Sequence, residues 1–507
     1  MTNLATLLTD SAWVHGDRTA VRDGNSALTY ARLDDLSARA AALLRDRGVR
    51  PGDRVAVIMP NVLHFPVVYY AVLRLGAVVV PMNPLLKAGE IAFTLRDSGA
   101  RTLLASPMAA TEAAEASAAT GTDFLVVEPA GFDALLDRTE PLPGVADARG
   151  SDLAVILYTS GTTGTPKGAE LTHRNLLGNT ATVVQTLFHV TPGDVLFGGL
   201  PLFHAFGQTC GLNAAVAAGA TLTLLTRFDP AAALETIRRD AVTVLLGVPT
   251  MYAALLHAEL PDGFDAPRLR LAVSGGASLP VEVLHGFEKR FGVDVLEGYG
   301  LSETSPVAAF NPPHRPRKPG SIGLPVRGVE LRLVRTDGTT AGPGEIGEIA
   351  IRGENVMAGY HNRPQATAEA IRDGWFHTGD LARVDEDGYH FIVDRTKDLI
   401  IRGGCNVYPR EIEEVLYAHP AVAEAAVVGI PDRLLGEEVA AVVVLRADAR
   451  ATAPEIRDHV KAEVAAYKYP RVVTFAEALP KGPTGKILKR EIVVARAPAP
   501  VESRAGS

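Results

Sequence analysis

The sequence has little cysteine, with only Cys210 and Cys405 among 507 residues. Two cysteines so far apart build neither a disulfide framework nor a metal site with the usual short ligand spacing. Low cysteine usage also favours a reducing compartment, so we expect a cytoplasmic protein. We expect Cys405 to be structural, because nothing in the sequence supplies it with an activating partner.

Basic charge is also scarce, since the formal net charge is −8 and no long block of Lys or Arg occurs. An acidic chain of this kind is a poor candidate for binding nucleic acid. The N-terminus has no basic region, and Asp10 interrupts its short apolar run, which argues against a secretory signal. Pro66 and Arg74 interrupt the most apolar stretch (65–82), so we predict buried elements and no membrane span.

What the chain does have is an alternation of short β-branched runs with Ala- and Leu-rich helical patterns. Continuous apolar strands separated by helices indicate an α/β fold with largely parallel sheets. The predicted strands lie at 54–60, 77–82, 102–106, 123–127, 154–160, 221–226, 242–249 and 269–275.

The pattern of predicted helices, strands and turns changes twice toward the C-terminus. From about Ser321, turn dipeptides such as Asp337-Gly338 and Asp373-Gly374 predict a smaller β-rich subdomain. After 394–397 a helix (408–419), two strands and a second helix (454–466) predict a small α+β domain. The last residues (496–507) contain few large apolar side chains, and we expect them to be disordered.

One segment, 158–168, follows an apolar strand and combines hydroxyl side chains, glycines and a lysine. Glycines allow turns whose N–H groups face phosphate oxygens, and hydroxyls and a lysine add donors and charge. The spacing is not that of a Walker A loop. A flexible linker is the alternative, but linkers rarely end in Pro-Lys-Gly directly after a buried strand. The candidate phosphate-binding residues are Thr159, Ser160, Gly161, Thr162, Thr163, Gly164 and Lys167.

This segment resembles the phosphate-loop signature of the AMP-forming adenylating superfamily, which includes acyl-CoA synthetases, peptide-synthetase adenylation domains and beetle luciferases. Four further segments resemble its other motifs in the family's order: 298–303 (with Ser302 where Thr is common), 375–380, 394–398 and 480–486. The resemblance covers nearly the whole chain. It implies a large N-terminal domain of stacked α/β subdomains (1–394), a hinge (395–397) and a mobile C-terminal domain (398–495).

The resemblance also implies a reaction in two halves. A carboxylate first attacks the α-phosphorus of ATP and releases pyrophosphate, and a thiol, usually that of CoA, then attacks the acyl-adenylate. Lys486 is expected to bridge the carboxylate and the α-phosphate. Glu303 is expected to hold Mg²⁺, although it could instead be a helix-start acid that complements the dipole.

Further residues are expected around the nucleotide. Asp380 would accept hydrogen bonds from the ribose, unless it lies in a surface turn, and Arg395 would hold ribose or phosphate, unless it is a solvated hinge charge. Tyr299 could stack on adenine or pack in the core. The segment 275–277 resembles the adenine side, with a plain strand-to-helix turn as the alternative. The full expected set is Gly275, Gly276, Ala277, Glu297, Gly298, Tyr299, Ser302, Asp380 and Arg395.

The expected acid pocket contains no Arg or Lys, whereas a dicarboxylate would need a cation for its second charge. This favours an apolar monocarboxylate that is fatty, aryl or terpenoid. Without the family resemblance, a lone histidine such as His204 would more often pack in the core or at the surface than bind a substrate. The expected pocket residues are His204, Val248, Met251, Gly300 and Leu301. By resemblance, Gly403 and Gly404 would line the CoA tunnel after a rotation about a pivot near Lys397.

We therefore predict an acyl-CoA ligase that uses ATP, Mg²⁺ and CoA. The alternative is an adenylating enzyme that hands its acyl-adenylate to an acyl carrier protein or a partner enzyme. A homodimer is compatible with the sequence. A serine hydrolase that uses Ser302 is excluded, because the GxSxG elbow needs glycine where Thr304 stands.

Overall fold

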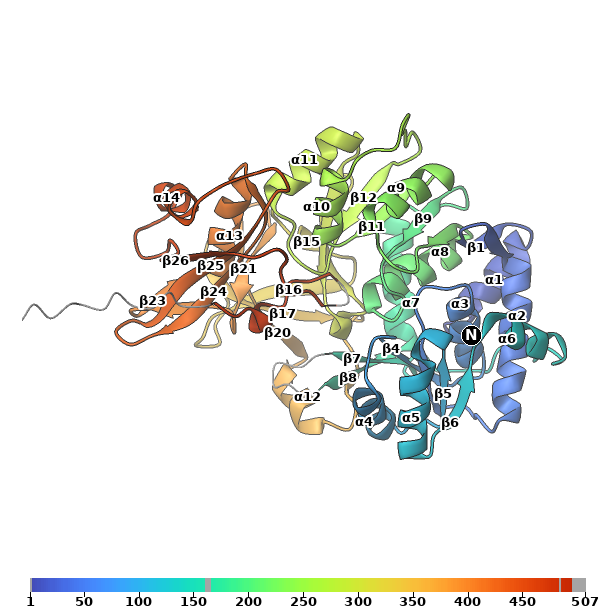
Figure 1. The fold of residues 1–507 in the computed structure, drawn as a ribbon. Coiled ribbons are helices and arrows are strands. Elements are labelled where there is room, and N and C mark those ends of the chain that lie inside the picture. The colour runs from blue at the N-terminus through green and yellow to red at the C-terminus, as the bar shows by residue number, and fades with distance from the viewer. Residues whose placement is uncertain (1, 160–165, 483–484, 495–507) are drawn as a thin grey trace, which may run out of the picture.

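A computed structural model describes residues 2–159, 166–482 and 485–494 (Figure 1). Five of the predicted phosphate-loop residues lie outside the described residues: Ser160, Gly161, Thr162, Thr163 and Gly164. The predicted C-terminal tail also lies outside them.

Nine strands form the first sheet, in the order β15-β14-β13-β12-β11-β9-β10-β1-β2. Its central strands pair in parallel and are almost wholly buried, as their continuous apolar sequences predict. The strands are β1 (Thr19–Asp23), β2 (Ser26–Thr29), β9 (Val195–Gly198), β10 (Thr221–Leu224), β11 (Val244–Gly247), β12 (Leu271–Ser274), β13 (Val295–Gly300), β14 (Val307–Phe310) and β15 (Leu324–Pro325).

Seven strands form the second sheet, in the order β18-β8-β7-β4-β3-β5-β6. The strands are β3 (Arg54–Ile58), β4 (Val78–Met82), β5 (Thr102–Ala105), β6 (Asp123–Val126), β7 (Leu153–Thr159), β8 (Lys167–Thr172) and β18 (Gly359–Tyr360). Strands β7 and β8 are an antiparallel hairpin in which Thr159 pairs with Lys167. The described ends of the predicted phosphate loop therefore lie side by side.

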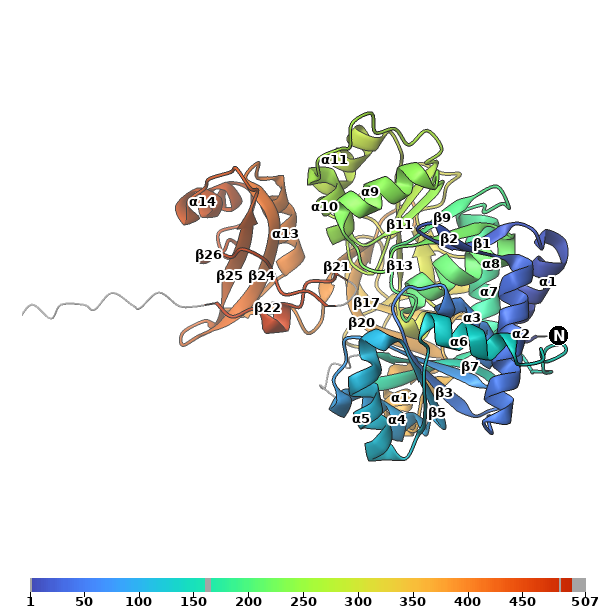
Figure 2. The same ribbon diagram turned by 45° about the vertical axis from the view of Figure 1, so that its right-hand side comes forward.

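Helices cover these two sheets (Figures 1 and 2). They are α1 (Thr6–His15), α2 (Tyr30–Asp46), α3 (His64–Arg74), α4 (Ala88–Ser98), α5 (Ala110–Thr120), α6 (Pro129–Asp137), α7 (His173–Thr182), α8 (Ala214–Ala218), α9 (Pro230–Arg239), α10 (Pro249–His257) and α11 (Val281–Phe291). Two π-helical stretches, η2 (Val183–Leu187) and η3 (Phe206–Asn213), and two 3₁₀ turns, η1 (Pro107–Ala109) and η4 (Ser302–Thr304), complete this part. π-helical stretches occur frequently at functional sites.

A β-rich subdomain and a small α+β domain follow, as the sequence predicts. The subdomain contains β16 (Val329–Val334), β17 (Ile346–Gly353), α12 (Pro364–Ala370), β19 (Ile371–Arg372), β20 (Trp375–Val384) and β21 (His390–Arg395). The small domain contains β22 (Ile400–Arg402), β23 (Cys405–Val407), α13 (Pro409–Ala418), β24 (Val422–Asp432), β25 (Gly436–Leu445), α14 (Ala453–Glu463), β26 (Val472–Phe475) and η5 (Lys489–Glu491).

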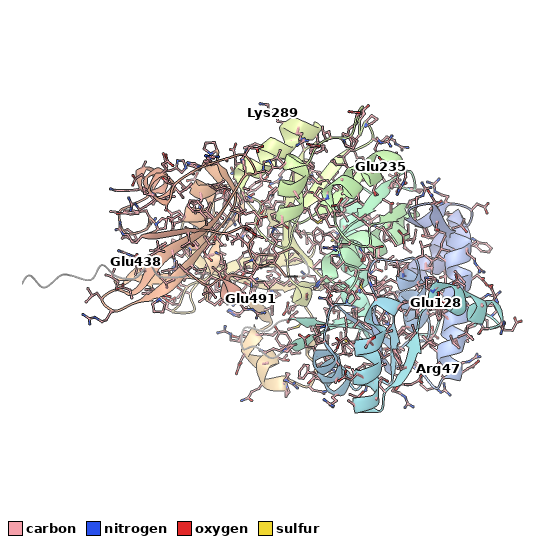
Figure 3. All side chains as sticks on the ribbon, in the orientation of Figure 1. Arg47, Glu128, Glu235, Lys289, Glu438 and Glu491 are labelled. Carbon is pink, nitrogen blue, oxygen red and sulfur yellow. The ribbon has the colours of Figure 1, made fainter. Side chains whose placement is uncertain are left out.

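The small domain forms a lobe beside the rest of the molecule (Figure 2). It has a hydrophobic core of its own, which includes Val407, Leu416 and Val427. Its Glu438, labelled in Figure 3, pairs with Arg402 across neighbouring strands at 2.5 Å. The predicted α/β class, with a large N-terminal part and a small C-terminal part, is confirmed.

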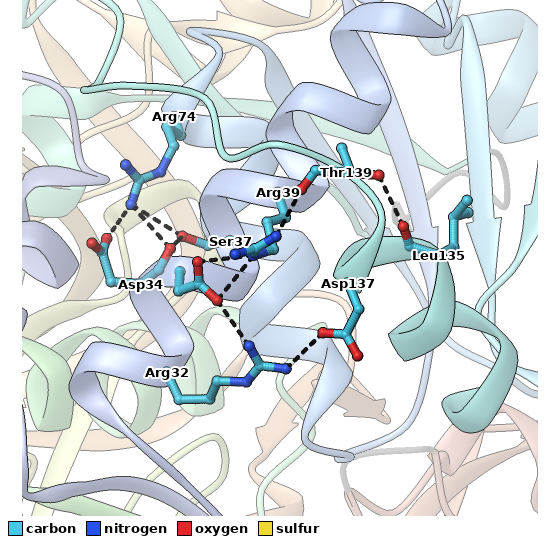
Figure 4. Close-up of polar contacts among 9 residues, drawn as sticks. Arg32, Asp34, Ser37, Arg39, Arg74, Leu135, Asp137 and Thr139 are labelled. Atoms are coloured by element: carbon cyan, nitrogen blue, oxygen red, sulfur yellow. Dashed lines mark hydrogen bonds and ion pairs between the residues drawn. The ribbon is translucent and has the colours of Figure 1, made fainter.

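The apolar stretch at 65–82 forms the buried helix α3 and strand β4. Arg74, which interrupts it, is itself buried and pairs with the Asp34 carboxylate on α2 (Figure 4). Its Nη1 also donates to the Gly144 carbonyl at 3.0 Å. The charge is thus paired within the protein. Among the residues that the structure describes, no helix is long and apolar enough to cross a membrane.

Candidate active site

A cavity of about 390 Å³ lies where strands β11, β12 and β13 end and the small domain begins. Ligands of open α/β sheets typically bind at the carboxyl ends of the strands. Most of the predicted site residues meet here: His204, Val248, Gly275, Gly276, Ala277, Glu297, Gly298, Tyr299, Gly300, Leu301, Ser302, Asp380, Arg395 and Lys486 all line the cavity.

Three of these residues form one hydrogen-bonded group. The buried Asp380 accepts a hydrogen bond from the Tyr299 hydroxyl at 2.6 Å and forms an ion pair with Arg395 Nε at 2.9 Å. Burial and the neighbouring Asp380 carboxylate raise the pKa of Tyr299 well above its usual value, so its hydroxyl stays protonated. The group presents a carboxylate, a hydroxyl and a guanidinium, which suits a sugar edge and a phosphate.

Glu303 lies on η4, beside the β7–β8 hairpin and outside the cavity lining. Its Oε1 accepts a hydrogen bond from the Tyr360 hydroxyl at 3.0 Å, and the Thr159 hydroxyl lies 3.5 Å away. Lys167 Nζ lies 5.2 Å from the centroid of the Tyr360 ring, in cation–π distance. Burial raises the pKa of Glu303, so a nearby cation would stabilise the charged form of this carboxylate.

The Gly485-Lys486 segment enters the cavity from the small domain. The Thr250 hydroxyl donates to the Gly485 carbonyl at 3.1 Å. Gly485 has φ +78°, and a Cβ there would lie 2.6 Å from Thr250 Oγ1, so only glycine fits. Burial, and then the positive charge of Arg395, lowers the pKa of Lys486 to about 8.

Hydrogen bonds between the domains hold this arrangement. On α13, Arg410 donates to the Ser278 hydroxyl and, at 3.4 Å, to the Gly320 carbonyl. Glu414 on the same helix accepts a hydrogen bond from the Val281 amide at 3.2 Å. Nothing in the local sequence pattern distinguishes these side chains from ordinary helix-surface charges, so the sequence did not identify them.

Glu297 is buried between these elements. Its Oε1 accepts a hydrogen bond from the Leu279 amide at 3.2 Å, whereas its Oε2 has no partner among the described residues. Burial raises its pKa to about 7, and Arg410 opposes that rise. Glu297 is therefore available to a hydrogen-bond donor on a ligand.

One part of the cavity lining, which we call its apolar end, consists of side chains of the large domain. Its walls come from η3, β12, β14 and the end of η2, and they include Phe188, Leu200, Cys210, Val273, Val307 and Phe310. His204 is buried at this end, burial lowers its pKa to about 4, and its Nε2 has no partner among the described residues. Among the described residues of the lining, the cationic side chains all lie at or beyond residue 395: Arg395, Arg410, Lys486 and Lys489.

A comparison with protein families matches residues 8–361 to the AMP-binding enzyme model and residues 411–486 to the AMP-binding enzyme C-terminal domain. The chain belongs to the AMP-binding enzyme family.

Known AMP-binding enzymes resemble this one over almost their full length. A feruloyl-CoA synthase of Amycolatopsis sp is 42% identical over 94% of this chain and 95% of its own. A long-chain-fatty-acid–CoA ligase of Bacillus subtilis is 37% identical over 97% and 94%. The solved anthranilate CoA ligase AuaEII, in complex with anthranoyl-AMP, is 30% identical and superimposes with a TM-score of 0.91 over 96% of both chains. The predicted ATP-dependent, AMP-forming acyl-CoA ligase is confirmed.

Seven of the described predicted residues lie outside the cavity lining of this AMP-binding enzyme: Thr159, Lys167 and Glu303, which lie at the β7–β8 hairpin and η4, and four residues elsewhere. Met251 is buried on α10, although Thr250 and Ala253 of the same helix line the cavity. Gly403 and Gly404 form the exposed turn between β22 and β23, and Lys397 is exposed between β21 and β22. Cys405 is free and exposed beside that turn.

Proposed function

We propose that this acyl-CoA ligase activates an apolar monocarboxylic acid. The observation that carries the proposal is the apolar end of the cavity, where the described walls offer no cation to a second carboxylate. His204, neutral at pH 7, offers a hydrogen bond to the single carboxylate. The fatty and aryl acids in the names of the two relatives belong to this class.

In the first half-reaction a carboxylate oxygen bonds to the α-phosphorus of ATP, and the bond from that phosphorus to the pyrophosphate oxygen breaks. Negative charge develops between the acid and the α-phosphate. Lys486, held in the cavity by the Gly485 carbonyl, supplies a fixed positive charge there. Asp380 and Arg395 orient the ribose, Glu297 and Tyr299 face the base, and the 275–277 turn lies beside it.

We propose a Mg²⁺ site at Glu303. Among the described residues no group of three or more His, Cys, Asp or Glu side chains could hold a metal ion. Mg²⁺ in nucleotide sites is typically held by one or two carboxylates together with phosphate oxygens, and a single buried carboxylate fits that pattern. Bound there, the ion would neutralise charge on the leaving pyrophosphate. Thr159, Lys167 and residues 160–164 would hold the phosphates.

In the second half-reaction the sulfur of a thiol, which gives up its proton, attacks the acyl carbon and AMP leaves. We propose that the small domain (398–495) turns about a hinge at 395–397, near the exposed Lys397, and brings Gly403 and Gly404 to the site. A pantetheine arm on a carrier protein is the alternative acceptor to CoA. The two free cysteines support a reducing, cytoplasmic location. A homodimer is not required by this scheme.

The test is ATP–pyrophosphate exchange without CoA, over a panel of fatty, aryl, terpenoid, dicarboxylic and amino acids. We expect exchange with one apolar class and at least about tenfold weaker exchange with dicarboxylates of the same size, because a buried charge would be unpaired. Preferred exchange with a dicarboxylate or an amino acid would contradict the proposal. Thioester formation on CoA, compared with a phosphopantetheinylated carrier protein, then identifies the acceptor.

A further inference from the structure

A carboxylate on α4, Asp97, joins three segments behind the β7–β8 hairpin. Its Oδ2 accepts a hydrogen bond from the Tyr158 hydroxyl at 2.8 Å, and its Oδ1 accepts one from Arg363 Nη2 at 2.6 Å. The Asn362 side-chain amide also donates to the Asp97 backbone carbonyl at 3.0 Å. None of these four residues lines the cavity, so contact with a ligand there does not explain the cluster.

The three segments meet at the hairpin that carries the predicted phosphate-binding residues. Tyr158 directly precedes Thr159, which pairs with Lys167 across the hairpin. Arg363 closely follows β18, and β18 pairs with β8. Asp97 therefore ties both strands of the hairpin to helix α4, one directly and one through the β18 segment.

The same short segment also contacts the hairpin from the active-site side. Tyr360 of β18 donates to Glu303, and Lys167 lies over its ring. The residues from Tyr360 to Arg363 thus fix the hairpin between Glu303 on one side and Asp97 on the other. A shift of this segment would move Thr159, Lys167 and Tyr360 together.

The charged Asp97 side chain at the centre of the cluster is largely buried, so the loss of its partners is costly. The Asp97 side chain is 10% exposed and the Arg363 side chain 36% exposed. Without Arg363 the carboxylate would keep only the neutral Tyr158 hydroxyl as its side-chain donor. A buried charge left short of partners destabilises the local arrangement, and a displacement of about 1 Å in a binding group can cost roughly 10²-fold in activity.

We propose that Asp97 and Arg363 are positioning residues for ATP, which act through the hairpin without touching the nucleotide. The proposal rests on the proposed function only in taking ATP as the ligand of the hairpin. Loss of a purely structural ion pair would lower stability and weaken the binding of every substrate alike. Loss of a positioning pair would weaken the binding of ATP selectively.

The experiment compares Arg363→Ala, Arg363→Lys and the control Arg47→Ala. Arg47 forms an ion pair with Asp123, which is also distant in sequence, with side chains 31% and 40% exposed, at the periphery of the large domain (Figure 3). Calorimetry without acid gives the dissociation constant for MgATP, exchange kinetics give KM for ATP and for the acid, and thermal melts give stability.

We expect Arg363→Ala to raise the dissociation constant and KM for ATP about tenfold, equivalent to about 1.4 kcal/mol, with KM for the acid changed less than about twofold. Arg363→Lys should recover part of the ATP affinity because it keeps the charge. An unchanged affinity for ATP in Arg363→Ala, or an equal rise of both KM values, would overturn the proposal. Because calorimetry needs no acid, it decides this question even if no acid in the panel supports exchange.

Discussion

Two glycine-containing segments of the small domain differ completely in their surroundings. Gly485 and Lys486 lie in the cavity, with the Gly485 carbonyl bonded to Thr250, whereas Gly403 and Gly404 form an exposed turn outside the cavity lining. The family resemblance assigns the first segment to adenylation and the second to thioester formation. The difference supports the proposal that one orientation of the small domain serves one half-reaction, and under that proposal each segment should be dispensable for the other half.

The largest expected effect comes from Lys486→Ala. It removes the positive charge that we propose acts at the reacting phosphate, and we expect pyrophosphate exchange to fall by about 10²–10³-fold. Thioester formation from supplied acyl-adenylate should stay within about twofold of the parent rate. Lys289→Ala, a surface lysine on α11 (Figure 3), is the control. Equal losses in both half-reactions would break the comparison between the two segments.

The pH dependence of exchange sharpens the same comparison. Lys486 has a lowered pKa of about 8, so it loses its charge as the pH rises through that value. We expect kcat/KM for ATP in the exchange reaction to fall about tenfold per pH unit above about 8, since this ratio reports the free enzyme. Lys486→Arg stays charged and should abolish this decline. A decline that persists in Lys486→Arg would assign it to another group.

Gly404→Ala should affect the opposite half-reaction. Gly404 has φ +81°, which costs a residue with a Cβ about 1–2 kcal/mol, and no atom lies within 4 Å of a Cβ in the present orientation. We expect exchange to be unchanged and thioester formation to slow about tenfold. Gly263→Ala, at φ +64° and equally unobstructed, is the matched control. Loss of exchange in Gly404→Ala would contradict the assignment.

The smallest expected effect concerns Phe188, which lines the cavity but belongs to neither glycine-containing segment. Phe188→Leu enlarges the apolar end of the cavity, and one extra buried CH₂ is worth about 0.8 kcal/mol, or about fourfold. We expect the preference in exchange assays to shift by about that factor toward acids one carbon longer. Phe197→Leu, equally buried on β9 but outside the cavity lining, should change stability without changing the preference.

The sequence predicted the architecture well because its signals are local. All eight predicted strands form, and each ends within two residues of the predicted limits, as expected for continuous apolar runs between turns. The last predicted helix was too long at its C-terminus, since the chain becomes extended at Val464. That helix starts at Ala453, where the Thr452 hydroxyl caps it.

The candidate site was only partly predictable. Tyr299 and Lys486 were named as candidates because their glycine-containing segments resemble motifs of the family, and both line the cavity. Tyr360 and Asp97 were not, because each belongs to an unremarkable segment and acquires its partners only when distant elements pack together. The predicted Met251 lies behind the cavity wall, since a helix turns successive side chains to different faces.

The cavity wall is built from both domains, with Arg410 and Glu414 donating to and accepting from the large domain. If the small domain turns as proposed, ATP affinity and domain orientation are two linked equilibria. If ATP binding favours this orientation by a given factor, the orientation raises the affinity for ATP by the same factor, because coupling is reciprocal. The interdomain hydrogen bonds that stabilise the orientation therefore also strengthen ATP binding. Release of pyrophosphate removes part of that ligand and thereby weakens the interactions that hold the small domain, at the step after which the proposed scheme has it turn.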